Sequence, residues 1–144
     1  MKNVLVITLM SAVLMGCTST TSMSLKEKDE VYSKYVVDEN LSAEDKVSGF
    51  KLSGWKSLSD SYLIVTAAHN KDYLIETKST CFGLNNQSEI KLNRSSDFAI
   101  SIVGDSISSV DDSTGKCFIS SIYPITREQR QYLVGIGRTA KNES

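Results

Sequence analysis

The side chains best suited to catalysis are few in this chain, which has one histidine and three cysteines in 144 residues. His69, the single imidazole, lies in a polar segment with Asp60 and Asp72 close by in the sequence. Because serines are abundant, a Ser/His/Asp hydrolase is one hypothesis, but no Gly-x-Ser-x-Gly motif marks a nucleophile. A histidine in a polar turn is usually only a turn residue, and one histidine excludes metal sites that need two. We therefore predict no catalytic residues, no metal site and no cofactor.

Aspartates at the ends of apolar runs form the second group of interest. Asp60, Asp97, Asp105, Asp111 and Asp112 could supply paired carboxylates for glycoside hydrolysis. Asp is also favoured at such positions because its side chain hydrogen-bonds the backbone of a turn, and we adopt this interpretation. The segment 111–115 lacks the alternating acids and the closing Glu of a calcium loop.

Composition argues against one broad class of function. The chain has 16 basic and 17 acidic residues and a formal net charge of −1, a balance unlike that of a strongly electrostatic nucleic-acid binder. Trp55 and four tyrosines could line a ligand groove. Aromatic residues in strand-like segments are more often buried or half-buried, and we expect this of Tyr62, Tyr73, Tyr123 and Tyr132.

The first cysteine ends an apolar segment. Lys2 gives a positive start, and residues 4–15 are almost entirely apolar but, at about a dozen residues, too short to span a bilayer. This pattern is typical of a secretory signal. Leu14-Met15-Gly16-Cys17 resembles the lipobox of bacterial lipoproteins, which implies a diacylglyceryl group on the Cys17 thiol, cleavage before Cys17 and acylation of the new amine. Met15 departs from the small residue usual at that position.

Lipidation of Cys17 would attach the chain to membrane lipid, since each buried methylene contributes about 0.8 kcal/mol. Thr18 follows Cys17, whereas Asp there resembles an inner-membrane retention signal, so we expect an outer-membrane protein facing the periplasm. We predict a signal peptide over residues 1–16, a lipidated Cys and polar tether over 17–24, one domain over 25–134 and a flexible tail over 135–144.

The other two cysteines, Cys81 and Cys117, form an even pair once Cys17 is lipidated. In an oxidising compartment such a pair is most simply a disulfide, and closing a loop of this length would contribute on the order of 4 kcal/mol. Two free thiols remain an alternative. A zinc or redox site is a poorer fit, because neither a neighbouring His nor a Cys-x-x-Cys spacing is present.

Local patterns predict the elements that position these residues. Ser24 and Glu27 form a capping box, which starts a helix that runs to about Asp38, and residues 42–45 are predicted to form a short turn. Thr126 caps a second helix, which is ended by glycines. Apolar or alternating runs between the helices predict short strands, at residues 50–55, 62–66, 72–77, 88–92, 98–103 and 117–123. Residues 107–110 continue the run 98–103 beyond a turn, and a proline stops the last strand.

These elements predict an α+β fold with mostly antiparallel strands. We expect a single small sheet or partly closed barrel of five to six strands, with a short helix at the N-terminus and another at the C-terminus. The 144 residues allow one such domain.

Short motifs in this order resemble a family. They are Phe50-Lys51-Leu52-Ser53-Gly54-Trp55, Tyr73-Leu74, Cys81-Phe82-Gly83-Leu84 and Cys117-Phe118-Ile119. Over residues 46–125 the chain is similar to a family of small, uncharacterised proteobacterial envelope proteins known only as a domain of unknown function. Many members carry a further Cys before the first strand. Residues 47–49 offer none, so the resemblance implies a bridge between Cys81 and Cys117.

We therefore expect a membrane-anchored envelope lipoprotein that acts as a non-enzymatic binding or scaffold module. Its partners would be membrane lipid through Cys17 and an envelope protein or wall polymer, and not nucleic acid. The alternatives are a small periplasmic hydrolase that uses Asp60, Asp72 or His69, and an inhibitor that inserts loop 83–89 or 104–116 into a periplasmic enzyme.

Overall fold

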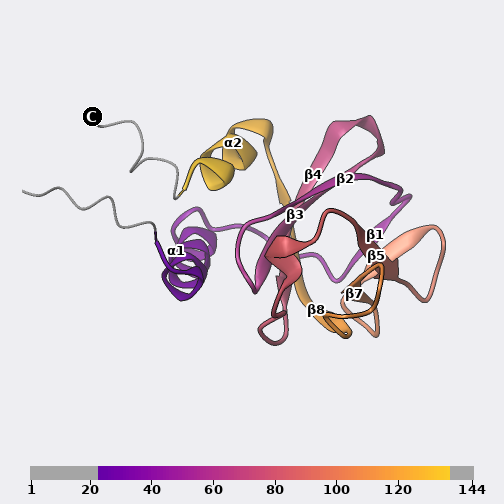
Figure 1. Ribbon diagram of the computed structural model, residues 1–144. Coiled ribbons are helices and arrows are strands. Elements are labelled where there is room, and N and C mark those ends of the chain that lie inside the picture. Colours follow the sequence, from indigo (N-terminus) through magenta and orange to yellow (C-terminus); the bar gives the residue numbers. More distant parts are fainter. Residues whose placement is uncertain (1–22, 137–144) are drawn as a thin grey trace, which may run out of the picture.

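The computed structural model describes residues 23–136 (Figure 1). The predicted signal peptide, nearly all of the tether and nearly all of the tail lie outside the described residues. The elements follow in the order α1 (Leu25–Asp38), β1 (Lys46–Ser48), β2 (Leu52–Ser57), β3 (Tyr62–Ala67), η1 (Ala68–Asn70), β4 (Lys71–Thr77), η2 (Leu84–Asn86), β5 (Ile90–Asn93), β6 (Ala99–Ser101), β7 (Ser106–Ser109), β8 (Cys117–Ile125) and α2 (Arg127–Gly135).

Six strands form one curled sheet in the order β2-β3-β4-β8-β7-β5, and every neighbouring pair is antiparallel. β1 and β6 form a separate antiparallel pair. The sheet curls into a half-barrel, so the predicted α+β class with a partly closed, mostly antiparallel barrel is confirmed. β2 and β5 are its two edges.

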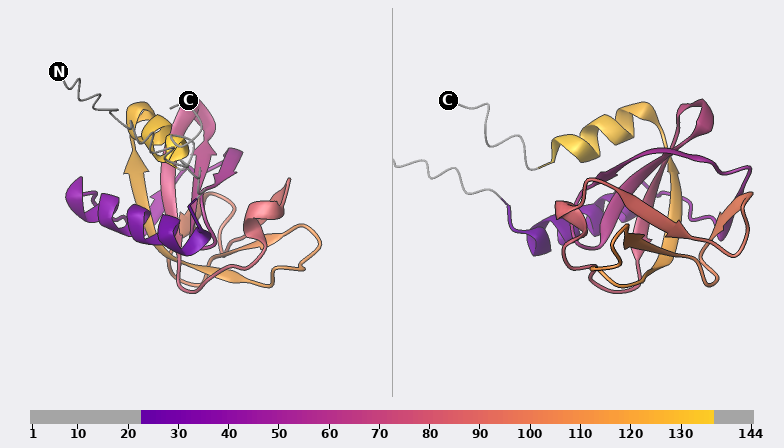
Figure 2. Two further views of the ribbon diagram at one scale, coloured as in Figure 1. Left: turned by 60° about the vertical axis from the view of Figure 1, so that its left-hand side comes forward. Right: turned by 45° about the vertical axis from the view of Figure 1, so that its right-hand side comes forward.

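A hydrophobic core lies on each face of the sheet, so β3 and β4 are buried on both sides. Leu63 and Val65 point into an inner core, which also contains β1, β7 and the two cysteines. Ile64 points into an outer core, which contains Tyr32 of α1 and Leu133 of α2. Figures 1 and 2 show both helices on one side of the sheet. A strand buried on both faces is apolar throughout, which explains the continuous run in β3.

Capping chemistry fixes the starts of both helices as the sequence predicts. The Ser24 side chain accepts the backbone N–H of Glu27, and the Glu27 carboxylate accepts the N–H of Ser24 at 2.7 Å. Thr126 and Gln129 make the same reciprocal pair at α2. Each box satisfies backbone donors that a helix end leaves free. The predicted hairpin of β3 and β4 is also confirmed.

Two sequence predictions about the backbone are wrong. Residues 42–45 form no helical turn; Glu44 is extended and donates its N–H to the carbonyl of Ile122 at 2.8 Å. Pro124 does not end the last strand, because β8 continues to Ile125 beside β4. On its other side, within residues 23–136, β8 pairs with β7 only at its start, at Cys117 and Phe118. A proline is tolerated where a strand has a free side, and β8 has one at Pro124.

The predicted strand over residues 98–103 is also shorter than expected. Only β6 is extended, and it pairs with β1 outside the main sheet. The buried carboxylate of Asp105 accepts the backbone N–H groups of Ser95 and Ser101 at 2.9 and 2.8 Å. These bonds replace part of a sheet ladder, so the loop folds back on Asp105 instead of extending.

Candidate binding clefts beside the first helix

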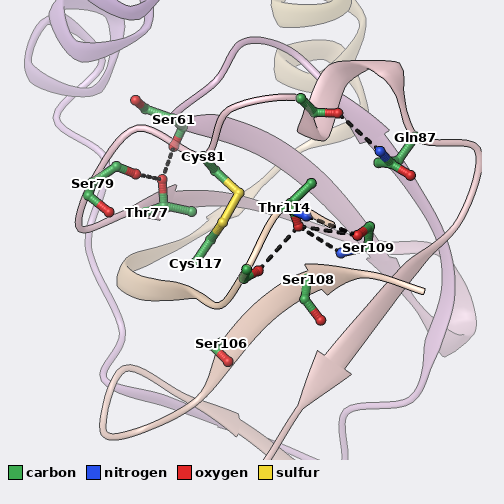
Figure 3. The surroundings of a disulfide bond; sticks show 12 residues. Ser61, Thr77, Ser79, Cys81, Gln87, Ser106, Ser108, Ser109, Thr114 and Cys117 are labelled. Carbon is green, nitrogen blue, oxygen red and sulfur yellow. Dashed lines mark hydrogen bonds between the residues drawn. A yellow bond between two sulfur atoms is a disulfide. The ribbon is translucent and has the colours of Figure 1, made fainter. Parts of the chain in front are cut away.

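The cysteine pair is resolved as a disulfide. Cys81 and Cys117 are bonded with Cα atoms 5.7 Å apart, and both are buried in the inner core (Figure 3). The bridge joins the segment after β4 to the start of β8 across 36 residues of chain. Its place in the core indicates a structural crosslink. Cys17 lies outside the described residues, and its lipidation stays a prediction.

The three residues of the hydrolase hypothesis are not assembled into one site. His69 lies in the β3–β4 turn with a left-handed backbone, φ 65°. Asp60 precedes β3 at the other end of the hairpin, and a six-residue strand is about 20 Å long. Asp72 accepts the Thr66 hydroxyl at 2.5 Å and pairs with Arg130 at 3.4 Å. The structure therefore separates Asp60 from His69 and gives Asp72 structural contacts.

The remaining aspartates mostly serve turns, as the sequence predicts. Asp105 closes the loop described above, whereas Asp97 is exposed. Asp111 accepts the N–H and hydroxyl of Ser113; hydrogen bonds from serines lower its pKa to about 2. Asp112 accepts the Ser108 hydroxyl at 3.2 Å. These contacts fix the β7–β8 loop.

The aromatic side chains do not share one groove. Tyr73 lies in the inner core, where Trp55 packs at its margin, while Tyr62 and Tyr123 lie in the outer core. The prediction for Tyr132 is wrong, because it is 59 % exposed and stacks on Tyr35 of α1. This contact ties the two helices together on their solvent side.

A wide cleft of about 700 Å³ runs between α1 and the end of the β3–β4 hairpin. We call it the acidic cleft, because its lining contains four carboxylates and only two lysines. These residues are Asp29, Glu30, Lys34, Asp38, Glu76 and Lys78. Lys34 pairs with Asp38 on the helix itself. The unbalanced charge would favour a cationic ligand.

A turn beneath the acidic cleft fastens α1 to the sheet. The Asp29 carboxylate accepts the hydroxyl of Ser59 and, at 3.0 Å, that of Ser61. Asp60 lies between them and is buried, and in the described part of the chain its Oδ1 has no hydrogen-bond partner. Burial, with a smaller contribution from the Asp29 charge, raises the pKa of the Asp60 carboxyl. Burial and then the Glu76 charge raise the pKa of Tyr62.

A second cleft, of about 330 Å³, lies on the other side of α1. We call it the basic cleft, because two lysines line it and no carboxylate does. Its polar and aromatic residues come from α1, from the edge strand β2 and from the segment between η2 and β5. They are Lys28, Trp55, Lys56, Ser57, Asn85, Gln87 and Ser88.

The inner core positions the amides of the basic cleft. Two residues after Cys81 the chain turns at Gly83, whose φ of 81° lies in the left-handed region that favours glycine. Leu84 is fully buried and anchors η2. The Gln87 amide donates to the Gly83 carbonyl at 3.4 Å (Figure 3). The disulfide and Leu84 thus hold this turn against the core, while Asn85 and Ser88 face solvent.

Comparison with known proteins identifies a family. The model of the Family of unknown function (DUF6491) matches residues 1–140. The chain belongs to this family. Neither the search of curated proteins nor the search of solved structures found a match. The expected resemblance to an uncharacterised family is confirmed in this general form.

The DUF6491 match includes the residues of both clefts and also residues 1–22. Within residues 23–136, no three His, Cys, Asp or Glu side chains gather as a metal site would require. The same residues contain no helix long and apolar enough to span a membrane.

For this DUF6491 chain the sequence analysis singled out Trp55 and the loop 83–89, which contains Asn85, Gln87 and Ser88, but it did not bring them together with Lys28 and Lys56 in one cleft. Lys28 and Gln87 are 59 positions apart, and no local pattern links residues from separate elements. The sequence held one indirect signal: the predicted disulfide at Cys81 fixes the chain to the core a few residues before Asn85 and Gln87.

Proposed function

We propose that the protein is a lipid-anchored envelope protein whose β-rich domain acts as a non-enzymatic binding module. The observation that carries the proposal is the sequence from Lys2 to Cys17, in which a positive start and a short apolar run end in a lipobox-like motif. The family match begins at residue 1, so this segment lies inside the matched region.

The anchor and the folded domain are close together along the chain. α1 begins at Leu25, eight residues after Cys17, and eight residues span at most about 29 Å when fully extended. Both clefts border α1. Lipidation of Cys17 would therefore hold both clefts near a membrane surface, which raises the effective concentration of a partner there.

A binding role agrees with the contacts better than a hydrolytic one does. The hydrolase hypothesis uses Asp60, Asp72 or His69, but β3 separates Asp60 from His69. The Asp72 carboxylate is held by the Thr66 hydroxyl and by Arg130. The clefts, in contrast, are lined by charged and amide side chains that protrude from a disulfide-crosslinked core. Such groups recognise ligands without a reactive nucleophile.

The Cys17→Ser variant tests the anchor, with Thr18→Ser as a matched control. We expect the wild type and Thr18→Ser to incorporate labelled palmitate, to lose residues 1–16 and to fractionate with membranes. We expect Cys17→Ser to remain unlabelled and uncut, because serine cannot form the thioether. Normal processing and membrane fractionation of Cys17→Ser would overturn the anchor.

The Thr18→Asp variant tests the location. If Thr18 directs the protein to the outer membrane facing the periplasm, the aspartate variant should shift to the inner-membrane fraction on a density gradient. An unchanged distribution would contradict this part of the proposal.

A further inference from the structure

We propose that the basic cleft binds an anionic saccharide, a sugar chain that carries a carboxylate. The inference rests on the proposed binding function and names its ligand class. It depends on three features of the cleft: its charge, its hydrogen-bonding groups and its aromatic ring.

The position of the cleft makes it accessible from outside. β2 is an edge of the six-stranded sheet, and β3 is its one strand partner among the described residues. α1 approaches this edge from the outer face, and the turn after Cys81 approaches it from the inner layer. The volume, about 330 Å³, falls in the range of small-molecule sites, roughly 300–1,000 Å³.

The charge of the cleft is unbalanced. Lys28 and Lys56 line it, and across residues 23–136 neither lysine has a carboxylate within ion-pair distance. Both also line a smaller adjoining hollow with Tyr32 and Val134. The chain as a whole has a net charge of −1, so this concentration of positive charge is local. Two lysines that line the same cleft attract an anion as mobile point charges.

The hydrogen-bonding groups suit sugar hydroxyls and acetamido groups. Asn85 presents an amide with both donors and an acceptor. Gln87 donates one of its two amide N–H groups to the Gly83 carbonyl, which leaves the second N–H as a donor and the carbonyl oxygen as an acceptor. Ser88 adds a hydroxyl, and Ser57, whose hydroxyl donates to the Ser59 carbonyl at 3.4 Å, adds an acceptor. Because a sugar hydroxyl both donates and accepts, a mixed set of amides and hydroxyls matches it better than lysines alone would.

The aromatic ring distinguishes a saccharide from a simple anion. Trp55 lines the cleft and is half-buried, packed against the inner core on one side. One face of a pyranose ring presents C–H groups, which pack by dispersion on an indole. Inorganic phosphate has no such face, and a flat membrane surface would not fill a concave cleft. The combination therefore favours a sugar ring with an attached acid.

Trp55 also provides the measurement, because it is the single tryptophan of the chain. The protein is purified as the cell produces it, from the membrane or the soluble fraction according to where it is found and with detergent present in either case, and its tryptophan emission is followed during titration. The probes are the disaccharide N-acetylglucosaminyl-N-acetylmuramic acid, which carries one carboxylate, the neutral N,N′-diacetylchitobiose, and inorganic phosphate. We expect the acidic disaccharide to shift the emission and to bind at least tenfold more tightly than the neutral one, with no shift from phosphate.

Matched variants place the effect in the cleft. Lys28→Gln with Lys56→Gln should weaken binding of the acidic disaccharide at least fivefold by calorimetry, while Lys34→Gln with Lys78→Gln, in the acidic cleft, should leave it unchanged. Trp55→Ala should weaken it at least tenfold. Trp55→Phe keeps an aromatic ring and should lose less. Lys34, Lys56 and Lys78 are exposed and Lys28 is partly buried, so the lysine variants disturb the core less than Trp55→Ala and test the site even if that variant folds poorly.

Several outcomes would overturn the inference. They are equal affinity for the acidic and neutral disaccharides, a shift with phosphate alone, no response to any saccharide, or equal loss from both lysine pairs. A further such outcome can come from protein reconstituted into neutral and anionic vesicles. If the tryptophan emission changes with the charge of the lipid and not with added saccharide, the cleft binds the membrane surface and the inference fails. This titration does not depend on Cys17, so the ligand and the anchor can fail separately.

Discussion

Consecutive residues of α1 border clefts of opposite charge: Lys28 lines the basic cleft and Asp29 the acidic cleft. Successive side chains of a helix point about 100° apart, because one turn takes 3.6 residues. A single helix laid on a sheet can therefore divide the adjoining surface into two regions with different charge. The comparison shows that the docking of α1 creates both clefts. The helix itself supplies three of the four carboxylates of the acidic cleft, whereas β2 and the segment after η2 supply most of the polar lining of the basic cleft.

The two clefts are held together by different means. In the acidic cleft, Asp29 ties α1 to the turn before β3 through serine hydroxyls. In the basic cleft, half of the polar lining comes from a turn fixed by Cys81 and Leu84. A change that loosens one of these supports should therefore affect one cleft more than the other.

Removal of the disulfide should have the largest effect. Replacing Cys81 and Cys117 with alanine frees a loop of 36 residues in the unfolded chain, and we expect a loss of about 4 kcal/mol in the free energy of unfolding. Urea titration measures this loss. The environment of Trp55 should change in the folded variant, because the turn after Cys81 is released. A loss below about 1 kcal/mol would show that the inner core does not depend on the bridge.

Loss of the Asp29 carboxylate should rank second. Asp29→Ala leaves the Ser59 hydroxyl, which is fully buried, without its acceptor. Removing the partner of a buried polar group costs about 2 kcal/mol, and α1 should loosen beside the acidic cleft. The neighbouring Glu30→Ala is the control and should change stability by less than about 0.5 kcal/mol. Equal effects from both variants would mean that Asp29 does not fasten the helix.

Asp60 should give a smaller effect of opposite sign. Its pKa is raised, so the folded state holds this proton more tightly than the unfolded state, and stability falls as the pH rises through the raised pKa. Asp60→Asn should therefore stabilise the protein by about 1 kcal/mol at neutral pH, because the variant buries a neutral amide where the wild type buries a charged carboxylate that lacks a hydrogen-bond partner at Oδ1. The gain should fade at acidic pH, where Asp60 itself is protonated. Chemical denaturation at both pH values measures it, and destabilisation at neutral pH would contradict the account.

The sequence predicted the parts of the molecule that depend on neighbouring residues. Ser24 and Glu27 mark the start of α1, and the apolar run of β3 marks the centre of the sheet. The prediction that the last strand stops at Pro124 was wrong, because only the pairing of β8 with its neighbours shows which side of that strand is free. The clefts were also beyond prediction, since Lys28 and Gln87 come to line the same cleft only in the folded chain.

The central claim, that the domain is a binding module that acts through a cleft, is tested most directly by photocrosslinking in cells. A photoreactive residue replaces Ser88, at the rim of the basic cleft, or Asp97, which is exposed and lines neither cleft. Adducts are identified by mass spectrometry. We predict a reproducible adduct from position 88 that position 97 does not give, and its loss on Lys28→Gln with Lys56→Gln. The absence of adducts at 88, or the same adducts at both positions, would contradict the account.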